Sequence, residues 1–344
     1  MTTLRVRLSL TGDCGGKSVA DPTLYDASLV RAVQTFQRRH GIRSDGVVGD
    51  ATRDALNVSV HERIAQLDRA RLGSTQPLPT GRWIRINVPG FWLQVLDGEH
   101  VVLEMPVVVG RPSRPTPLFE KPLSAIVFNP AWTVPPDLAY HDLLPKIIAD
   151  PSYLAQRQID VYASWEPGAA RLDPRGIDWQ RLGARIEGLT LRKRPGPGNG
   201  LGRMMFRMEA EPEIFLHDTP AREVFRQDRR DLSSGCIRVA DAEGLARAVL
   251  DAGARADLPA FLARRDTFAV PLPHPVPVRT VYETAWVDAR GTVNFRDDIY
   301  DADARMAPAS KQAAVPRREP SAPAWPGNAA AGLAAAARPR EPRP

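Results

Sequence analysis

Cysteine is scarce in this chain: its 344 residues include only Cys14 and Cys236. Two cysteines allow one bridge at most, which excludes a disulfide scaffold. They also exclude a zinc site made of four cysteines, and no pair of histidines has the spacing of a site that adds two histidines to two cysteines. We therefore expect no metal and no fold held together by disulfides.

Long apolar runs are also absent. None approaches the roughly 18 residues that a membrane-spanning helix needs, so the sequence predicts no transmembrane segment. The first residues, MTTLRVRLSLTGDCGG, contain two arginines but no long apolar stretch and no small-residue cleavage site. They do not resemble a secretory signal. Taken alone, these absences predict a protein that stays in the cytoplasm.

Excess charge is confined to the C-terminus. The formal net charge is +6, but seven basic and two acidic residues after Asp303 account for +5, which leaves +1 for the rest. These last residues are rich in alanine and proline, a composition that cannot bury enough surface to offset the entropy of ordering. We expect a disordered basic tail at 303–344 and no nucleic-acid partner, with attraction to another anionic polymer as the alternative.

The sequence of residues 24–56 predicts a helix, a turn and a second helix. Val30, Val33 and Phe36 form an apolar stripe at helical spacing, and SDG signals a turn. A further helix is expected at about 59–72. The motif AVQTFQRRHGIRSDGVVGDATRDAL resembles the peptidoglycan-binding repeat. A pair of helices that only docks the next domain explains the stripe equally well. We place a helical module at 1–73 and a linker at 74–81.

From Arg82 onward, apolar and polar residues alternate, and β-branched and aromatic residues are frequent. Further strands are expected, mostly antiparallel, at 122–129, 203–208, 213–217, 268–272, 278–287 and 292–295. Residues 137–190 look helical and irregular, like an insertion over one face of a sheet. The fold class is a mainly β domain at 82–302 with a small all-α domain before it.

The stretch FLHDTPAREVFRQDRRDLSSGCIRV places Cys236 directly after a glycine and His217 at the end of an expected strand, nineteen residues earlier. A thiol needs a base or a positive neighbour to act as a nucleophile at neutral pH. Gly235 allows main-chain amides to converge on a developing oxyanion. The Ser233 hydroxyl can fix either the loop or the histidine tautomer. A buried cysteine that only fills space is the alternative. Zinc binding by His217, Asp218 and Cys236 would lack a fourth ligand.

The steps HDTP and SSGCIRV resemble the YkuD-type L,D-transpeptidases of bacterial cell walls. The segments VVVGRPSRPTPLF, FNPAWTVPPDLAYHDLLPKIIADPSYL, RPGPGNGLGRMMFRM and VPVRTVYETAWVDARGTVNFRDDIY resemble the YcbB-like branch of that family. The resemblance implies a YkuD-like β-sandwich or barrel with a helical lid at about 137–190.

The resemblance also implies roles for single residues. Cys236 would be the nucleophile, and His217 the base and later the acid. Gly235 and Cys236 would supply oxyanion-hole amides, Arg238 would brace the site or meet a substrate carboxylate, and Ser233 would orient the histidine. The substrate-binding residues implied are Asn199, Trp132, Ser234, Asp218 and Thr219.

The implied reaction is transfer of a tetrapeptide stem through a cysteine thioester, with release of D-alanine and formation of a 3→3 cross-link. Water or a free D-amino acid as acceptor would give an L,D-carboxypeptidase or an exchange reaction. A non-catalytic wall-binding protein is the rival from another class. No cofactor is expected.

The partners implied are peptidoglycan tetrapeptide stems as donor and acceptor, and carbapenems as inhibitors. Such substrates require the periplasm or cell envelope, which conflicts with the missing export signal. We expect an N-terminus that is truncated or wrongly started. A Cys14–Cys236 bridge would block the nucleophile, so none is expected.

Overall fold

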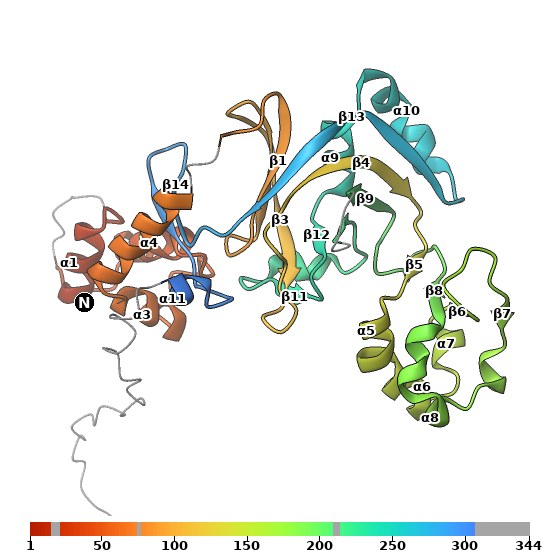
Figure 1. The fold of residues 1–344 in the computed structure, drawn as a ribbon. Coiled ribbons are helices and arrows are strands. Elements are labelled where there is room, and N and C mark those ends of the chain that lie inside the picture. Colours follow the sequence, from red (N-terminus) through yellow and green to blue (C-terminus); the bar gives the residue numbers. More distant parts are fainter. Residues whose placement is uncertain (15–20, 74–76, 209–213, 307–344) are drawn as a thin grey trace, which may run out of the picture. The chain divides into compact units, whose positions relative to one another are not determined.

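The computed structural model describes residues 1–14, 21–73, 77–208 and 214–306 (Figure 1). Residues Met1–Asp303 form one compact unit. The disordered tail expected at 303–344 lies, from residue 307 on, outside the described residues, as do residues 74–76 of the expected linker. The expectation is wrong for 303–306, which belong to the helix Ala302–Met306 with Asp303 buried. Among the described residues, no helix is both long and apolar enough to cross a membrane.

Four helices precede the first strand: α1 (Thr2–Leu10), α2 (Ala27–Arg39), α3 (Asp50–Asn57) and α4 (Val60–Gly73). Asp26 caps α2 by accepting hydrogen bonds from the backbone N–H groups of Ser28 and Leu29, both at 2.9 Å. Val33 and Phe36 of the predicted apolar stripe lie in the core of this module, which contains Leu8, Leu29, Ala32, Val33 and Phe36, whereas Val30 is half-buried outside that core. The predicted helices of 24–56 and 59–72 are thus confirmed.

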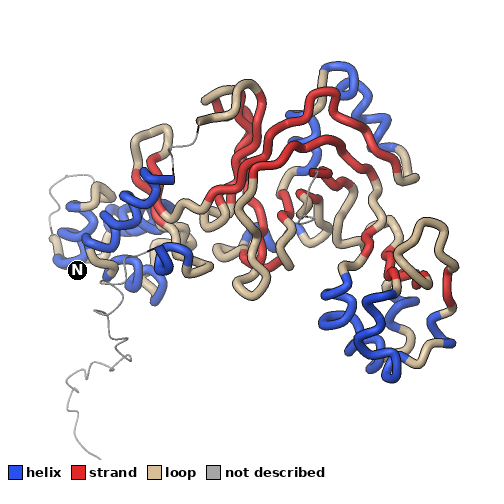
Figure 2. The backbone as a smooth tube through the Cα atoms, viewed as in Figure 1, coloured by secondary structure: helices blue, strands red, loops and turns tan. Residues whose placement is uncertain are grey.

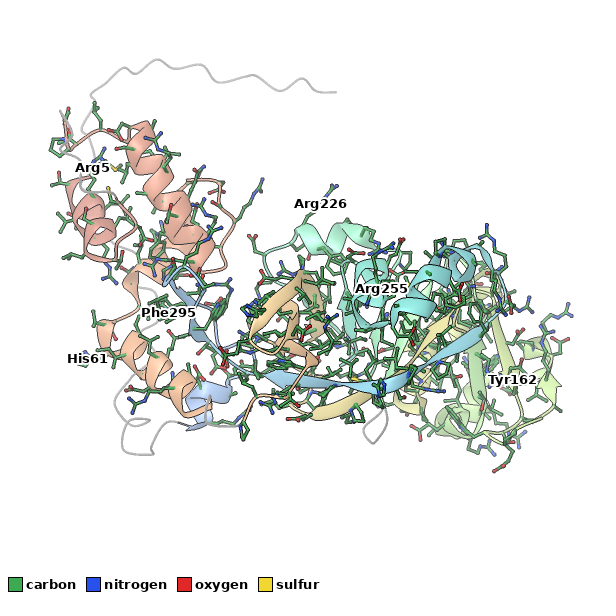
Figure 3. All side chains as sticks on the ribbon, turned by 90° about the horizontal axis from the view of Figure 1, so that it is seen from above. Arg5, His61, Tyr162, Arg226, Arg255 and Phe295 are labelled. Carbon is green, nitrogen blue, oxygen red and sulfur yellow. The ribbon has the colours of Figure 1, made fainter. Side chains whose placement is uncertain are left out.

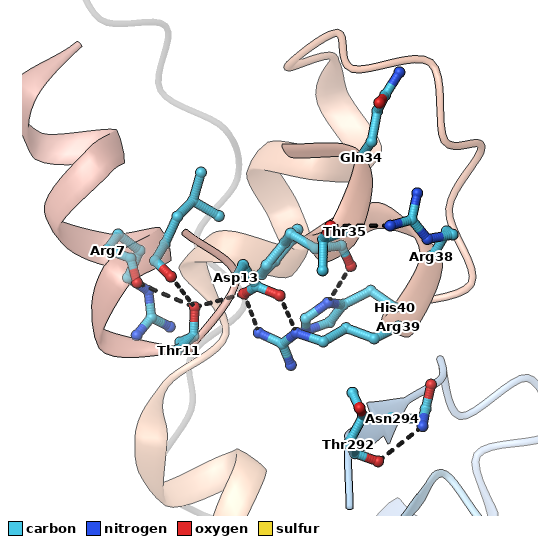
Figure 4. Close-up of polar contacts among 12 residues, drawn as sticks. Arg7, Thr11, Asp13, Gln34, Thr35, Arg38, Arg39, His40, Thr292 and Asn294 are labelled. Atoms are coloured by element: carbon cyan, nitrogen blue, oxygen red, sulfur yellow. Dashed lines mark hydrogen bonds and ion pairs between the residues drawn. The ribbon is translucent and has the colours of Figure 1, made fainter. Parts of the chain in front are cut away.

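A buried ion pair fixes the end of α2. The Arg39 guanidinium donates to both carboxylate oxygens of Asp13, each at 2.6 Å (Figure 4). The His40 ring lies beside the carbonyl of Phe36, 2.7 Å from it, and stacks on the Phe36 ring. Burial is the main cause that lowers the pKa of His40 to about 3, so the ring is neutral at neutral pH.

The helical module contacts a late segment of the chain. Phe295 lies in the hairpin of β14 (Ala285–Val287) and β15 (Val293–Phe295), and Figure 3 labels it. Its ring stacks against His40 with centroids 5.5 Å apart, and the Arg63 guanidinium lies 4.5 Å from its centroid. Asp303 in α11 (Ala302–Met306) pairs with Arg69 at 3.1 Å. The hairpin and α11 therefore join the module to the β domain.

The β domain is built on one large sheet with the order β11-β3-β12-β10-β9-β4-β13-β1-β2. An additional pairing of β2 with β3 closes the strands from β3 round to β2 into a barrel. The bounds are β1 (Arg82–Asn87), β2 (Trp92–Asp97), β3 (His100–Gly110), β4 (Glu120–Phe128), β9 (Met204–Met208), β10 (Leu216–His217), β11 (Asp231–Ser233), β12 (Ile237–Val239) and β13 (Phe268–Val281).

Most pairings are antiparallel, as predicted, but β1–β13, β10–β12 and β11–β3 are parallel. The strands alternate between buried and more exposed side chains, and their inner face forms the main core, which includes Ile84, Leu93, Ile126, Phe206 and Ile237. The helices α9 (Ala242–Val249) and α10 (Ala252–Ala263) follow β12, and Asp241 caps α9 by accepting a hydrogen bond from the Gly244 N–H. The mainly β fold with a helical module before it is confirmed.

Two predicted strands have other bounds in the structure. The sequence predicts strands at 268–272 and 278–287, but β13 covers the first and continues into the second as far as Val281, and the end of the second is the separate β14 (Figure 2, where β4 and β13 are the long central strands). Prolines interrupt the alternating pattern, and the register against β4 shifts between Pro271 and Val276. A bulge thus accommodates residues that cannot donate to the ladder.

The segment predicted as a helical insertion also contains a sheet. Its helices are α5 (Pro136–Leu138), η1 (Ala139–Leu143), α6 (Leu144–Ala149), α7 (Tyr153–Gln156), η2 (Pro174–Gly176), α8 (Trp179–Leu182) and η3 (Gly183–Gly188). Its four strands, in the order β5-β8-β6-β7, are β5 (Trp132–Thr133), β8 (Thr190–Lys193), β6 (Ile159–Tyr162) and β7 (Arg171–Leu172). The prediction of helical and irregular structure at 137–190 is therefore wrong where β6 and β7 lie. The sequence does not reveal these strands, because they are too short for a clear alternation of apolar and polar residues. The segment has its own core around Ile147, Val161 and Leu191.

Candidate active site

His217 ends β10, and Cys236 directly precedes β12, the strand that runs parallel beside β10. In the register of β10 and β12, Leu216 pairs with Ile237 and His217 with Arg238. The Ile237 N–H donates to the carbonyl of Phe215 at 2.9 Å, which extends the ladder to Cys236. Leu216 and Ile237 are fully buried in the core. Because side chains alternate along strands, His217 and Arg238 share the opposite face of the sheet, and Cys236 directly precedes the strand that carries Arg238.

The turn before the cysteine requires glycine. Gly235 has a φ of +111°, which side-chain-bearing residues rarely adopt. Its N–H donates to the Ser233 hydroxyl at 3.1 Å, and that hydroxyl donates to the Cys236 carbonyl at 2.6 Å. The Ser233 hydroxyl therefore holds the turn, which is one of the two roles that the sequence offers for it; the other, orienting the histidine, stays a prediction. The Gly235 N–H, expected to serve an oxyanion, is engaged with Ser233 in this structure.

The histidine is oriented by the residue that follows it. His217 Nδ1 lies 2.5 Å from the carbonyl oxygen of Asp218, a partner that can only accept. Nδ1 must therefore carry the proton, and Nε2 is left with the lone pair that a base needs. Burial lowers the pKa of His217 to about 4, an effect that the Asp218 carbonyl opposes and the Arg238 charge reinforces. The imidazole is neutral at neutral pH.

Arg238 connects the two reacting groups electrostatically. Burial lowers the pKa of its guanidinium, and attraction to the Cys236 thiolate opposes that shift. The same positive charge disfavours protonation of His217. The positive charge of Arg238 therefore acts on both groups, favourably on a Cys236 thiolate and unfavourably on a protonated His217.

Two residues missed by the sequence analysis hold the cysteine turn from outside. Thr116, which is buried, accepts a hydrogen bond from the Gly110 N–H at 2.8 Å and donates to the Gly235 carbonyl at 2.7 Å. The hydroxyl of Tyr300 donates to the Gly110 carbonyl and accepts from the Thr116 N–H. The only sequence signal for either residue is its place in a segment that resembles the family: Thr116 lies in VVVGRPSRPTPLF, and Tyr300 ends VPVRTVYETAWVDARGTVNFRDDIY.

The residues expected to bind substrate lie in three places. Asp218 and Thr219 are buried and line a cavity of about 520 Å³. Asn199 is buried, and its amide donates to the carbonyls of Pro130 and Arg194 and accepts from the Leu201 N–H. Its side chain therefore organises the loop that borders this cavity. Ser234 is exposed in the cysteine turn.

Trp132 lies in β5, opposite Lys193, and packs against the core of the inserted segment. That segment is joined to the loop that carries Thr116: Arg114 pairs with Asp137 at 2.9 Å and with Asp142 at 2.7 Å. Movement of the insertion would therefore pull on the loop that holds the cysteine turn. Among the described residues, no group of three or more histidine, cysteine or acidic side chains is placed to hold a metal ion.

The model of the YkuD family, described as an L,D-transpeptidase catalytic domain, matches residues 81–276. The chain belongs to this family. A second model, described as "Putative peptidoglycan binding domain", matches residues 12–56, within the helical module. The YkuD match covers both β10 and β12, so the segments that carry Cys236 and His217 lie inside the catalytic domain.

A protein of Haemophilus influenzae, named "Putative L,D-transpeptidase", is 36% identical over 226 residues, which are 65% of this chain and 45% of that relative. The chain thus matches less than half the length of this YkuD relative. An L,D-transpeptidase structure from Mycobacterium smegmatis is 14% identical, with 58% of each chain covered and a TM-score of 0.26. One from Stackebrandtia nassauensis is 12% identical over 81% of this chain and 89% of that one, with a TM-score of 0.29. Likenesses to solved structures this low add nothing to the assignment.

Proposed function

We propose that this protein is a peptidoglycan L,D-transpeptidase of the YcbB-like branch, which forms 3→3 cross-links through a thioester on Cys236. One observation supports this most: within a YkuD domain, a neutral histidine ends one strand and the cysteine directly precedes the parallel strand beside it. Asp218 leaves the lone pair on His217 Nε2, the nitrogen that would take the thiol proton.

In the first half-reaction, the Cys236 sulfur attacks the carbonyl between diaminopimelate and the terminal D-alanine of a tetrapeptide stem. His217 takes the thiol proton and gives it to the departing D-alanine nitrogen as the C–N bond breaks. The Cys236 N–H would stabilise the oxyanion, joined by the Gly235 N–H if its bond to Ser233 is exchanged. A thioester and free D-alanine result.

In the second half-reaction, a side-chain amine of a neighbouring stem attacks the thioester carbonyl. His217 now accepts a proton from the amine and returns it to the sulfur as the C–S bond breaks. The products are a 3→3 cross-link and free Cys236. The cycle balances without a cofactor, since each proton taken by His217 is given back.

The acceptor would be selected by the segment at 137–190 acting as a lid. Excluding water would favour an amine, whereas an open site would make the enzyme an L,D-carboxypeptidase or a D-amino-acid exchanger. The ion pairs of Arg114 with Asp137 and Asp142 support a link between this segment and the cysteine turn. We propose domains at 1–73 and 82–302, joined by a linker at 74–81.

Such a substrate would place the protein in the periplasm or cell envelope. The helical module would hold the catalytic domain near the wall, a role supported by its match to a peptidoglycan-binding model. Asn199, Trp132, Ser234, Asp218 and Thr219 are proposed as substrate-binding residues, with Asn199 acting through its loop.

Incubation of the protein with disaccharide-tetrapeptides, followed by mass spectrometry, tests the reaction. We expect cross-linked dimers and free D-alanine from the native protein, and neither from Cys236→Ala. His217→Gln should lower the rate by about 100-fold or more, since it removes the proton carrier. Tripeptides without dimers would replace the transpeptidase by a carboxypeptidase.

A carbapenem provides a second test that needs no acceptor. We expect a covalent adduct on Cys236 at neutral pH, located by peptide mass mapping, with Cys14 unmodified as the internal control. An unmodified Cys236 would favour a non-catalytic wall-binding protein instead.

A further inference from the structure

A recess with unusual charge lies beside the catalytic histidine. The cavity of about 520 Å³ has three arginines in its wall, Arg203, Arg222 and Arg265, together with the Gly-Pro loop at 195–197. Its lining includes one acidic residue, Asp218. The three guanidiniums come from separate segments of the chain, so the fold and not a local run of basic residues brings them together.

Asp218 neutralises only one of these arginines. Its carboxylate pairs with Arg222 through one oxygen, and its other oxygen accepts from the backbone N–H of Arg203 at 2.8 Å. The Arg203 guanidinium donates to the carbonyl of Leu262. Among the described residues, neither Arg203 nor Arg265 has an ion-pair partner, although most ion pairs of this protein involve an arginine. Two arginines of the wall thus lack a counter-charge among the residues that the structure describes.

The recess and the base share a wall. Asp218 accepts the His217 Nδ1–H through its carbonyl and organises the arginines through its carboxylate. Gly202 lets the backbone of its loop lie close to the Asp218 side chain, because a Cβ at that position would lie 2.4 Å from the Asp218 carboxylate. A ligand group held in the recess is therefore adjacent to the residue that orients the imidazole.

The geometry points to this recess as a subsite for a carboxylate of the peptide stem, an inference that rests on the proposed function. A guanidinium offers paired donors that match a carboxylate, and two such groups in a concave wall concentrate the positive potential. Pro195, Gly196 and Pro197 contribute no long side chain to the lining. The recess would thus anchor the stem while its reacting carbonyl meets Cys236.

The stem has two candidate carboxylates, on the terminal D-alanine and on the diaminopimelate side chain. Three tetrapeptides distinguish them: one with both groups free, one amidated at D-alanine, and one amidated at diaminopimelate. Binding is measured by calorimetry on the full chain carrying Cys236→Ala, which removes turnover. We expect one of the two amidated peptides to bind about tenfold more weakly than the free peptide.

Arg265→Gln and Arg203→Gln should each abolish that difference by weakening only the peptides that keep the recognised carboxylate. Arg207→Gln is the matched control, since Arg207 is exposed on β9, outside the cavity wall, and has no ion-pair partner among the described residues. A difference that survives both recess variants overturns the subsite, as does an equal loss for all three peptides.

Turnover by the native protein is recorded separately. Cross-linking without charge-dependent binding would overturn the subsite and keep the transpeptidase. Charge-dependent binding that the recess variants abolish, without any turnover, would keep the subsite and overturn the acyl transfer. If no peptide binds, the subsite is overturned.

Discussion

At the scale of single residues, the state of His217 decides how the site works. Its pKa of about 4 lies well below the ordinary value of 6.5, mainly because the ring is buried. A neutral imidazole can take a proton from the thiol, whereas an imidazolium cannot. The base form should therefore persist far into acid, and the site does not depend on a preformed pair of charges.

This gives a prediction for the pH dependence of the reaction. As the pH is lowered, the rate of Cys236 acylation by a carbapenem should fall only near pH 4, where His217 becomes protonated, and not near pH 6.5. The rate is measured by mass spectrometry in buffers from pH 3.5 to 8, within the range where the protein stays folded. An acid limb between pH 6 and 7 would show that a protonated imidazole forms readily, against the buried environment described above.

The same shift affects stability, and the sign follows from proton binding. Between pH 6.5 and 4 the unfolded chain binds a proton on this histidine while the folded protein does not, so stability falls as the pH falls. A shift from 6.5 to about 4 corresponds to a loss of about 3 kcal/mol across that window. Denaturant unfolding at pH 7 and pH 4.5 should show a smaller loss for His217→Gln than for the native protein. Equal losses of stability in the two proteins would contradict the lowered pKa of His217.

At the scale of elements, the hydroxyl of Thr116 joins the end of β3 to the cysteine turn. Thr116→Val keeps the shape but leaves the Gly110 N–H and the Gly235 carbonyl without this partner. Each unpaired buried group costs about 1–3 kcal/mol, so we expect clear destabilisation. We also expect acylation of Cys236 to slow by about tenfold as the turn loosens, an effect of positioning.

Thr116→Ser is the matched control, because it keeps the hydroxyl and should restore most of the acylation rate. The rates are compared at a temperature where all variants are folded, as judged by circular dichroism. A Thr116→Val variant that is less stable but acylates normally would reduce Thr116 to a structural role.

Which features the sequence could predict depends on how local they are. Cys236 and His217 lie nineteen residues apart in one motif, and two short strands suffice to bring them together. Thr116 bonds to the same turn from 119 residues away, Tyr300 bonds to the Thr116 N–H from 184 residues away, and no periodicity in the chain links them. The same limit applies to the recess, whose arginines belong to three separate segments. Local chemistry was therefore predictable, and the contacts that position it were not.

Ser233 shows a further limit. The sequence leaves open whether its hydroxyl fixes the loop or the histidine, because a serine hydroxyl bonds to whichever groups the turn presents. With Gly235 at positive φ, those groups are the Gly235 N–H and the Cys236 carbonyl. The carbonyl of Asp218 meets the imidazole. The residue type was predictable, but its partner depends on a backbone angle that the sequence does not specify.

At the scale of the whole molecule, the last described segment joins the helical module to the cysteine turn. Asp303 pairs with Arg69 of α4, and Tyr300, three residues earlier, bonds to the β3–Thr116 loop. Gly41, directly after α2 and its cap, is so close to Arg296 that a Cβ there would lie 2.5 Å from the Arg296 Nε. The module and the catalytic domain are therefore packed as one body through residues 295–303.

Phe295 is the centre of this packing, and its removal gives the last prediction. Phe295→Ala should destabilise the protein by about 3–5 kcal/mol, because it removes a buried ring that stacks on His40 and lies under the guanidinium of Arg63. Hydrogen exchange should show increased opening in α2 and α4, with the strands around β10 and β12 less affected. The stability of Phe295→Leu, which keeps apolar volume but no ring, should lie between that of the native protein and that of Phe295→Ala. If amides of α2 and α4 stay as protected as in the native protein, the hairpin does not hold the module, and the module's stability must come from its own core.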